Sequence, residues 1–142
     1  MHFCIRHIGL LFICALEVTH LCAQSTVEIT INDVKSNQGE LRIGLFHEKD
    51  FLKDIVEGKI VKPMKGSVTV VFENVKPGTY AISVLHDENE NGILDRTRLG
   101  IPKEGFAFGN NAMGKKGPPT FDQAKIEVGD KPIKQVLKMK YF

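Results

Sequence analysis

Cysteine is missing from most of this chain, and its absence limits how the fold can be stabilised. The three cysteines of the 142-residue sequence, Cys4, Cys14 and Cys22, all lie near the N-terminus. A chain cut after Ala23 keeps no thiol, so no disulfide can brace the mature domain even in an oxidising compartment. The domain therefore has to be held together by its hydrophobic core.

Long apolar runs are also missing, which excludes a membrane-spanning helix. The run Ile8 to Leu16 is roughly half as long as the ~20 apolar residues that cross a bilayer. Arg6 and His7 precede this run and the small residue Ala23 follows it, which is the pattern of a secretory signal peptide. Residues 1–23 are therefore predicted to be such a leader, and the protein is predicted to be periplasmic or secreted.

Cys22 offers a second way to attach the exported chain, through a lipid. Lipid attachment favours a small residue directly before the cysteine, whereas this chain has Leu21 there. Lipid anchoring through Cys22 is the less favoured alternative.

The chain has no excess of either charge, which argues against a nucleic-acid partner. It carries 19 Lys and Arg against 17 Asp and Glu, a formal net charge of +2. The lysines between Lys131 and Lys140 have the spacing of a solvated strand face. No internal repeat or heptad pattern is present, so residues 24–142 are expected to form a single domain.

Short alternating segments fill the mature chain and predict β-strands. Turn signals separate them every 8 to 12 residues, and a helical connector is expected only at 48–56. The first two strands are expected to pair as a hairpin or near-hairpin, and the last two to form a closing pair around Gly129-Asp130. This pattern predicts an all-β fold, an antiparallel β-sandwich of immunoglobulin-like or transthyretin-like type with about seven strands, and a small closed barrel is the alternative. The predicted strands are 26–31, 41–46, 59–61, 67–72, 79–85, a short one at Phe106 and Phe108, 121–128 and 132–141.

The segment Asp87 to Asp95 has the ligand spacing of a calcium loop. Calcium loops place oxygen ligands at alternate positions and a glycine at the sixth, where the chain turns sharply. Gly92 occupies that sixth position. An EF-hand is excluded because Arg98 stands where its glutamate would be. The predicted ligands are the side chains of Asp87, Asn89, Asn91 and Asp95 and the carbonyl of Ile93.

The same residues have a second interpretation that needs no ion. Asn and Asp favour Asx turns, in which a side-chain oxygen accepts a hydrogen bond from the backbone two residues further on. Only Asp87 and Asp95 would bring carboxylates to the site. Calcium would therefore bind with an affinity of roughly 10⁻⁴ to 10⁻³ M, as in extracellular modules.

Candidate catalytic residues are few. The sequence has no serine-nucleophile motif, no H-E-x-x-H motif and no phosphate-binding loop. His86 and His47 are expected at strand ends, as surface or turn residues. The alternative is an enzyme that uses His86, Asp87 and Glu104 in a pocket built by the loops of residues 100–119.

Six glycines lie between Gly92 and Gly117, and this segment holds the remaining candidate residues. Asn110 and Asn111 are expected either to support the ion loop or to serve in ordinary turns. Phe106 and Phe108 are expected to be core residues rather than a platform for a ligand.

The segment from His86 to Phe121 carries a family resemblance. The run HDENENGILD, followed by LGIPKEGFAFGNNAMGKKGPPTF, resembles domain-of-unknown-function family 2141, a family of secreted bacterial proteins. The resemblance implies an exported single-domain protein and supplies no catalytic residues. The run VKPGTYAISVLHDENENG is also similar to transthyretin-like and collagen-adhesin B-type modules, which favours the sandwich.

These features together predict an exported, non-enzymatic β-sandwich. Its expected partner is a protein or a glycan of the cell envelope, and its expected cofactor is a calcium ion in the Asp87–Asp95 loop.

Overall fold

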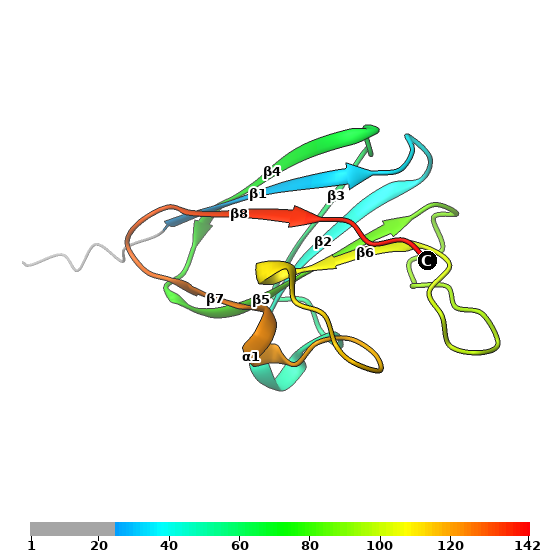
Figure 1. The fold of residues 1–142 in the computed structure, drawn as a ribbon. Coiled ribbons are helices and arrows are strands. Elements are labelled where there is room, and N and C mark those ends of the chain that lie inside the picture. Colours follow the sequence, from blue (N-terminus) through cyan, green and yellow to red (C-terminus); the bar gives the residue numbers. More distant parts are fainter. Residues whose placement is uncertain (1–24) are drawn as a thin grey trace, which may run out of the picture.

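The computed structural model describes residues 25–142, which form two β-sheets packed face to face (Figure 1). The predicted leader, its cleavage site and Cys22 lie outside the described residues. The all-β sandwich is confirmed, with eight strands in two separate sheets rather than a closed barrel. The strands are β1 (Ser25–Val34), β2 (Glu40–Phe46), β3 (Glu57–Val61), β4 (Gly66–Val75), β5 (Gly78–Asp87), β6 (Gly105–Phe108), β7 (Lys125–Val128) and β8 (Ile133–Lys138). The helical turns are η1 (Glu48–Asp50), η2 (Gly109–Asn111) and α1 (Phe121–Ala124).

The first sheet has the order β4-β1-β8. Strand β1 pairs with β4 antiparallel and with β8 parallel, so the sandwich is mostly, not wholly, antiparallel. In the second sheet β3, β2 and β5 are consecutive neighbours. The free edge of β5 is shared: β7 pairs with its first half and β6 with its second.

Both predicted strand pairings are wrong. Strands β1 and β2 follow each other in the chain but belong to different sheets, as do β7 and β8. Alternation of apolar and polar residues determines which face of a strand is buried, but it carries no information about which strand lies beside it. Each connection crosses from one sheet to the other instead of turning back in the same one.

The helical segments also do not lie where the sequence predicted them. The connector at 48–56 holds one 3₁₀ turn, η1, followed by a hydrogen-bonded turn and bends. A turn of α-helix, α1, replaces the first half of the strand expected at 121–128. The Gln123 side chain accepts a hydrogen bond from the Thr120 backbone N–H at 2.9 Å, half of the capping-box pattern that starts a helix.

The main core lies between the sheets, where the alternating apolar residues of both meet. Among its fully buried members are Ile29, Phe72, Ile43, Ile82 and Leu137. A second apolar cluster covers part of the outer face of the second sheet. There the Phe51 ring contacts the rings of Phe108 and Phe121, with centroid distances of 6.5 and 5.9 Å. In the described residues no helix has the length and apolar character needed to cross a bilayer.

Candidate functional site

Asp87 ends strand β5 and anchors the loop predicted to bind an ion. Its carboxylate is fully buried and accepts hydrogen bonds from the backbone N–H groups of Asn91, at 3.1 Å, and Gly92, at 2.6 Å. The guanidinium of Arg42 on β2 donates to the same carboxylate at 3.1 Å. Hydrogen bonds to a charged acceptor are among the stronger ones in proteins, so Asp87 fixes the path of the loop.

The other predicted ligand side chains converge on the same loop. The side-chain oxygen of Asn89 accepts from the Asn91 N–H at 3.2 Å, and that of Asn91 accepts from the Ile93 N–H at 3.0 Å. Both amide groups then donate to Asp95 Oδ2, at 2.6 and 3.1 Å. The alternating spacing therefore brings the four side chains together, and two of them, Asn89 and Asn91, form Asx turns. Ile93 takes part through its backbone, and its side chain is exposed.

Glu104, just before β6, closes the loop from the opposite side. It is buried, and its two carboxylate oxygens accept hydrogen bonds from the backbone N–H groups of Glu88 and Asp95, each at 3.0 Å. Sequence reasoning had placed Glu104 only in the alternative active site and had overlooked Arg42. Neither belongs to the alternating pattern, because both reach the loop through strand neighbours of β5.

His86 is buried inside the sandwich, so the expectation of a surface or turn histidine is wrong. Its Nε2 lies 2.8 Å from the carbonyl of Gln38 and its Nδ1 lies 2.8 Å from the hydroxyl of Tyr141. A carbonyl only accepts, so Nε2 carries a proton; in the neutral ring Nδ1 then accepts from the tyrosine hydroxyl. The same hydroxyl accepts from the Lys35 N–H at 3.1 Å. Burial raises the pKa of Tyr141, so the hydroxyl stays protonated to higher pH than that of an ordinary tyrosine.

Tyr141→Phe is expected to lower the free energy of unfolding by about 1.5 kcal/mol, because it leaves the buried Nδ1 of His86 without its donor. Urea denaturation measures this loss. Tyr80→Phe is the matched control, since the Tyr80 hydroxyl donates to the Lys76 carbonyl and serves no buried side chain. Equal losses in the two variants would show that the contact with His86 contributes nothing special.

The residues of the alternative active site do not form an accessible centre. His86 and Asp87 are fully buried, Glu104 is nearly so, and none of the three lines the cleft described below. His47 stacks on Tyr80, near the start of β5, whereas His86 stands near its end. Within residues 25–142 no three His, Cys, Asp or Glu side chains are grouped to hold a metal ion.

Asn110 and Asn111 do not support the ion loop. The amide of Asn110 donates to the carbonyls of Gln123 and Lys125, at 3.2 and 2.8 Å. Asn111 pairs with the β8 backbone: it donates to the Val136 carbonyl at 2.9 Å and accepts from the Lys138 N–H at 2.8 Å. The two asparagines therefore connect the edges of the two sheets.

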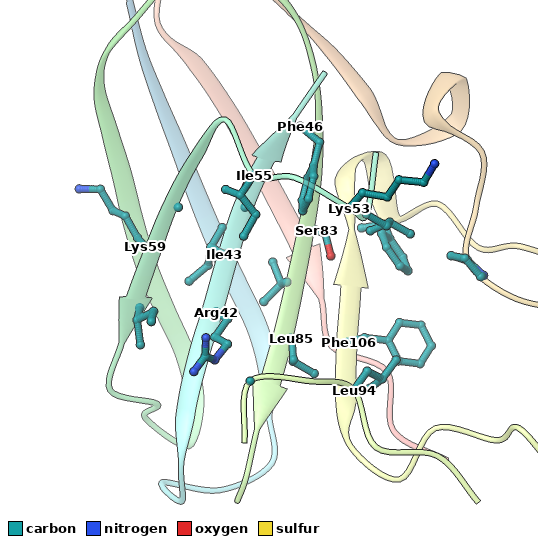
Figure 2. A pocket seen from close by; sticks show the side chains of 18 of the residues that line it. Arg42, Ile43, Phe46, Lys53, Ile55, Lys59, Ser83, Leu85, Leu94 and Phe106 are labelled. Carbon is teal, nitrogen blue, oxygen red and sulfur yellow. The ribbon is translucent and has the colours of Figure 1, made fainter. Parts of the chain in front are cut away.

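An apolar hollow of about 560 Å³ lies on the outer face of the second sheet (Figure 2). Ser83 and Leu85 of β5 and Phe106 of β6 line it, and Leu94 borders it from the loop that follows Asp87. Outward-facing residues of a sheet are normally polar, whereas most of the residues that line this hollow are apolar. We refer to this space as the first hollow.

A glycine pair shapes the other side of the first hollow. Gly44 on β2 is opposite Gly58 on β3, so no side chain projects from the sheet at this point. A methyl group at Gly44 would lie only 2.8 Å from the Phe46 ring, and one at Gly58 only 3.2 Å from Ile55. The glycines therefore allow Phe46 and Ile55 to lie close against the sheet.

A second hollow of about 490 Å³ adjoins the first and shares Leu94, Arg96, Phe106, Phe108 and Pro118 with it. We call the two hollows together the cleft. Phe106 and Phe108 are buried, as expected of core residues, yet they also line the cleft. The charged residues that line the cleft are all basic: Arg42, Lys53, Lys59, Arg96, Lys115 and Lys116.

The alternative active site placed a pocket among the loops of residues 100–119, and residues of this segment do line the second hollow. The first hollow was not predicted from the sequence. The lining of the whole cleft comes from four strands, three connections and Phe142, and its signal in the sequence was the glycine-rich segment from Gly92 to Gly117.

Comparison with known proteins places the chain in a family. No curated protein and no solved structure gives a significant match. The model of the family described as "Uncharacterized protein conserved in bacteria (DUF2141)" matches residues 29–135, well over half of the chain. The resemblance drawn from the segment His86 to Phe121 is thereby confirmed, and this chain belongs to the bacterial family DUF2141.

Proposed function

We propose that this protein is an exported, non-enzymatic binding module of the cell envelope, and that its partner docks in the first hollow. The observation that carries the proposal is the hollow itself, a concave apolar surface of about 560 Å³ on a sheet face. Ligand sites are typically concave and mainly apolar, with a few polar groups that orient the ligand. The candidate reactive residues are buried away from it, which favours binding over catalysis.

The lining of the first hollow favours a protein segment over a glycan. A glycan brings many hydroxyl groups, and each one left without a hydrogen bond on burial weakens binding. Among the described residues, Ser83 is the neutral polar side chain that lines this hollow. Lys53 and Arg96 supply positive charge instead, whereas the charge of Arg42 is compensated by Glu40 and Asp87. A segment with apolar and acidic side chains complements this surface.

The Asp87–Asp95 loop forms one wall of the hollow, through Gly92 and Leu94. We propose that calcium orders this wall. The oxygen donors fit a hard cation, since Asp87, Asn89, Asn91 and Asp95 are already gathered by hydrogen bonds within one loop. Arg42 opposes binding by pairing with Asp87, and the two asparagine amides must turn their oxygens toward the ion. Weak binding, roughly 10⁻⁴ M, is the expected result.

Calcium at 1 mM is expected to stabilise the protein by about 1.4 kcal/mol, which raises its Tm by roughly 5 °C, if the dissociation constant is ~0.1 mM. Thermal unfolding in calcium and in EDTA measures the shift. Asp95→Ala should remove the increment, because it deletes one of the two carboxylates that would bind the ion. If the unfolding curves of the wild-type protein coincide in calcium and EDTA, the loop binds no ion and is held by its hydrogen bonds alone.

Ile55→Asp and Ile60→Asp are each expected to weaken capture of an envelope partner about tenfold or more, because they place a negative charge beside the first hollow. Immobilised variants incubated with envelope extract report the effect by the amount of each bound protein. Val136→Asp is the matched control: Val136 is 55% exposed on the other sheet, against 57% for Ile55 and 58% for Ile60. Proteins retained equally by all three variants would contradict docking in the first hollow.

A further inference from the structure

Exposed apolar side chains surround the second hollow. Leu99 is 87% exposed and Phe142 is 75% exposed, and Ile101 and Met113 join them at its border. Buried Phe106 and Phe108 form its inner side. Large exposed apolar patches on soluble proteins usually mark binding surfaces. This patch surrounds a hollow instead of covering a convex surface, so it suits a narrow apolar group that enters it.

The charged side chains that line the second hollow all have one sign. They belong to Arg96, Lys115 and Lys116, and the described lining includes no Asp or Glu side chain. Arg96 is partly engaged, because its guanidinium donates to the Gly100 carbonyl at 3.1 Å. Lys115 and Lys116 are both exposed at the opening. A negatively charged group on a ligand is therefore favoured at this side of the hollow.

The polar chemistry of the second hollow restricts its ligands further. Its described lining holds apolar residues, glycines and the three basic residues, and no neutral side chain able to form hydrogen bonds. Sugars and nucleosides would bury hydroxyl or amide groups there without partners, which is costly. An alkyl chain has no such groups. A volume of about 490 Å³ lies within the range of small-ligand sites.

We propose that the second hollow binds a single-chain amphipathic anion, a long-chain carboxylate in its soluble monomeric form. The alkyl chain lies against Phe106 and Phe108 and between Leu99 and Met113. The carboxylate meets Lys115 and Lys116 at the opening. This site goes beyond the proposed docking of a protein segment in the first hollow, and it stands whether or not that docking occurs.

Calorimetric titration with octanoate, decanoate and dodecanoate, each below its micelle concentration, tests the apolar half of the proposal. Each methylene buried tightens binding by up to about fourfold, so each step of two carbons is expected to lower Kd by about tenfold. Dodecanol and dodecyltrimethylammonium, which carry the same chain with a neutral and a cationic head, should bind more weakly than dodecanoate. Equal affinities along the series, or no heat with dodecanoate, would overturn the proposal.

Charge reversal tests the polar half. The double variant Lys115→Glu, Lys116→Glu is expected to weaken dodecanoate binding at least tenfold and to leave dodecanol binding unchanged. The matched control, Lys62→Glu with Lys65→Glu at exposed positions between β3 and β4, changes the net charge equally and should bind dodecanoate like the wild type. A similar loss in both double variants would mean that only net charge matters. Binding to phosphatidylglycerol vesicles without binding to monomeric dodecanoate would also overturn the proposal.

The test separates this site from the proposed protein-docking site. Ile55→Asp alters the first hollow and does not touch the lining of the second. It should retain the affinity of the wild type for dodecanoate. Loss of dodecanoate binding in Ile55→Asp would place the ligand in the first hollow and contradict the assignment.

Discussion

Gly39→Ala is expected to lower the free energy of unfolding by about 4 kcal/mol. Gly39 lies in the connection between β1 and β2 with a φ of +69°. A methyl group there would lie 2.0 Å from the carbonyl oxygen of Asp87 and 2.6 Å from the Cα of Glu88. Both neighbours are backbone atoms at the start of the ion loop, so neither can move aside as a side chain would. The substitution combines left-handed strain with a backbone collision.

Urea denaturation of Gly39→Ala measures this loss, and Gly100→Ala is its control. Gly100 has a similar φ, +80°, but no atom lies within 4 Å of the position that its methyl group would take. Gly100→Ala should therefore cost only about 1 kcal/mol, from strain alone. If the two variants lose the same stability, the close approach of residue 39 to the ion loop is not a constraint on the fold.

Asp87→Ala is expected to destabilise the protein by about 3 kcal/mol in EDTA, independently of any ion. The substitution removes a fully buried carboxylate that accepts from two backbone N–H groups and from Arg42. The Gly92 N–H loses its partner, the Asn91 N–H keeps only its bond to the Asn89 side chain, and the loop loses the contact that fixes its path. Arg42 keeps its ion pair with Glu40 and is partly exposed, which limits the loss.

Denaturation of Asp87→Ala in EDTA separates this structural role from ion binding. Asp95→Ala is the comparison: Asp95 is only partly buried and accepts from two side-chain amides, so its loss in EDTA should be about 1 kcal/mol or less. Equal effects of the two substitutions in EDTA would contradict the anchoring role of Asp87. A much larger loss of stability in calcium than in EDTA would show that Asp87 also binds an ion.

The sequence predicted local features well because they arise from neighbouring residues. Alternation in β1 put Val27, Ile29 and Ile31 on one face, and all three are fully buried. The spacing of Asp87, Asn89 and Asn91 predicted that their side chains would converge, because alternate residues in a tight loop point to the same side. Strand existence and loop chemistry depend on spacing along the chain, and spacing is visible in the sequence.

The same reasoning failed for strand partners and for individual buried polar residues. Whether β1 pairs with β2 or with β4 depends on packing between whole sheets, which leaves no mark in a short window of residues. His86 resembled a surface histidine because its partners, Gln38 and Tyr141, are distant in the chain. Its burial is tolerable only because both ring nitrogens have hydrogen-bond partners.

The sequence by itself determined the family, the all-β class, the buried face of each strong strand and the polar character of the Asp87–Asp95 loop. Only the tertiary structure decided which strands are neighbours, which side chains hold the loop and where the cleft lies. Arg42 reaches Asp87 because β2 lies beside β5, and Phe106 meets Leu94 because β6 takes the free edge of β5. The physical reason is that strand patterning encodes burial, whereas a binding surface is made by residues that come together only when the sheets pack.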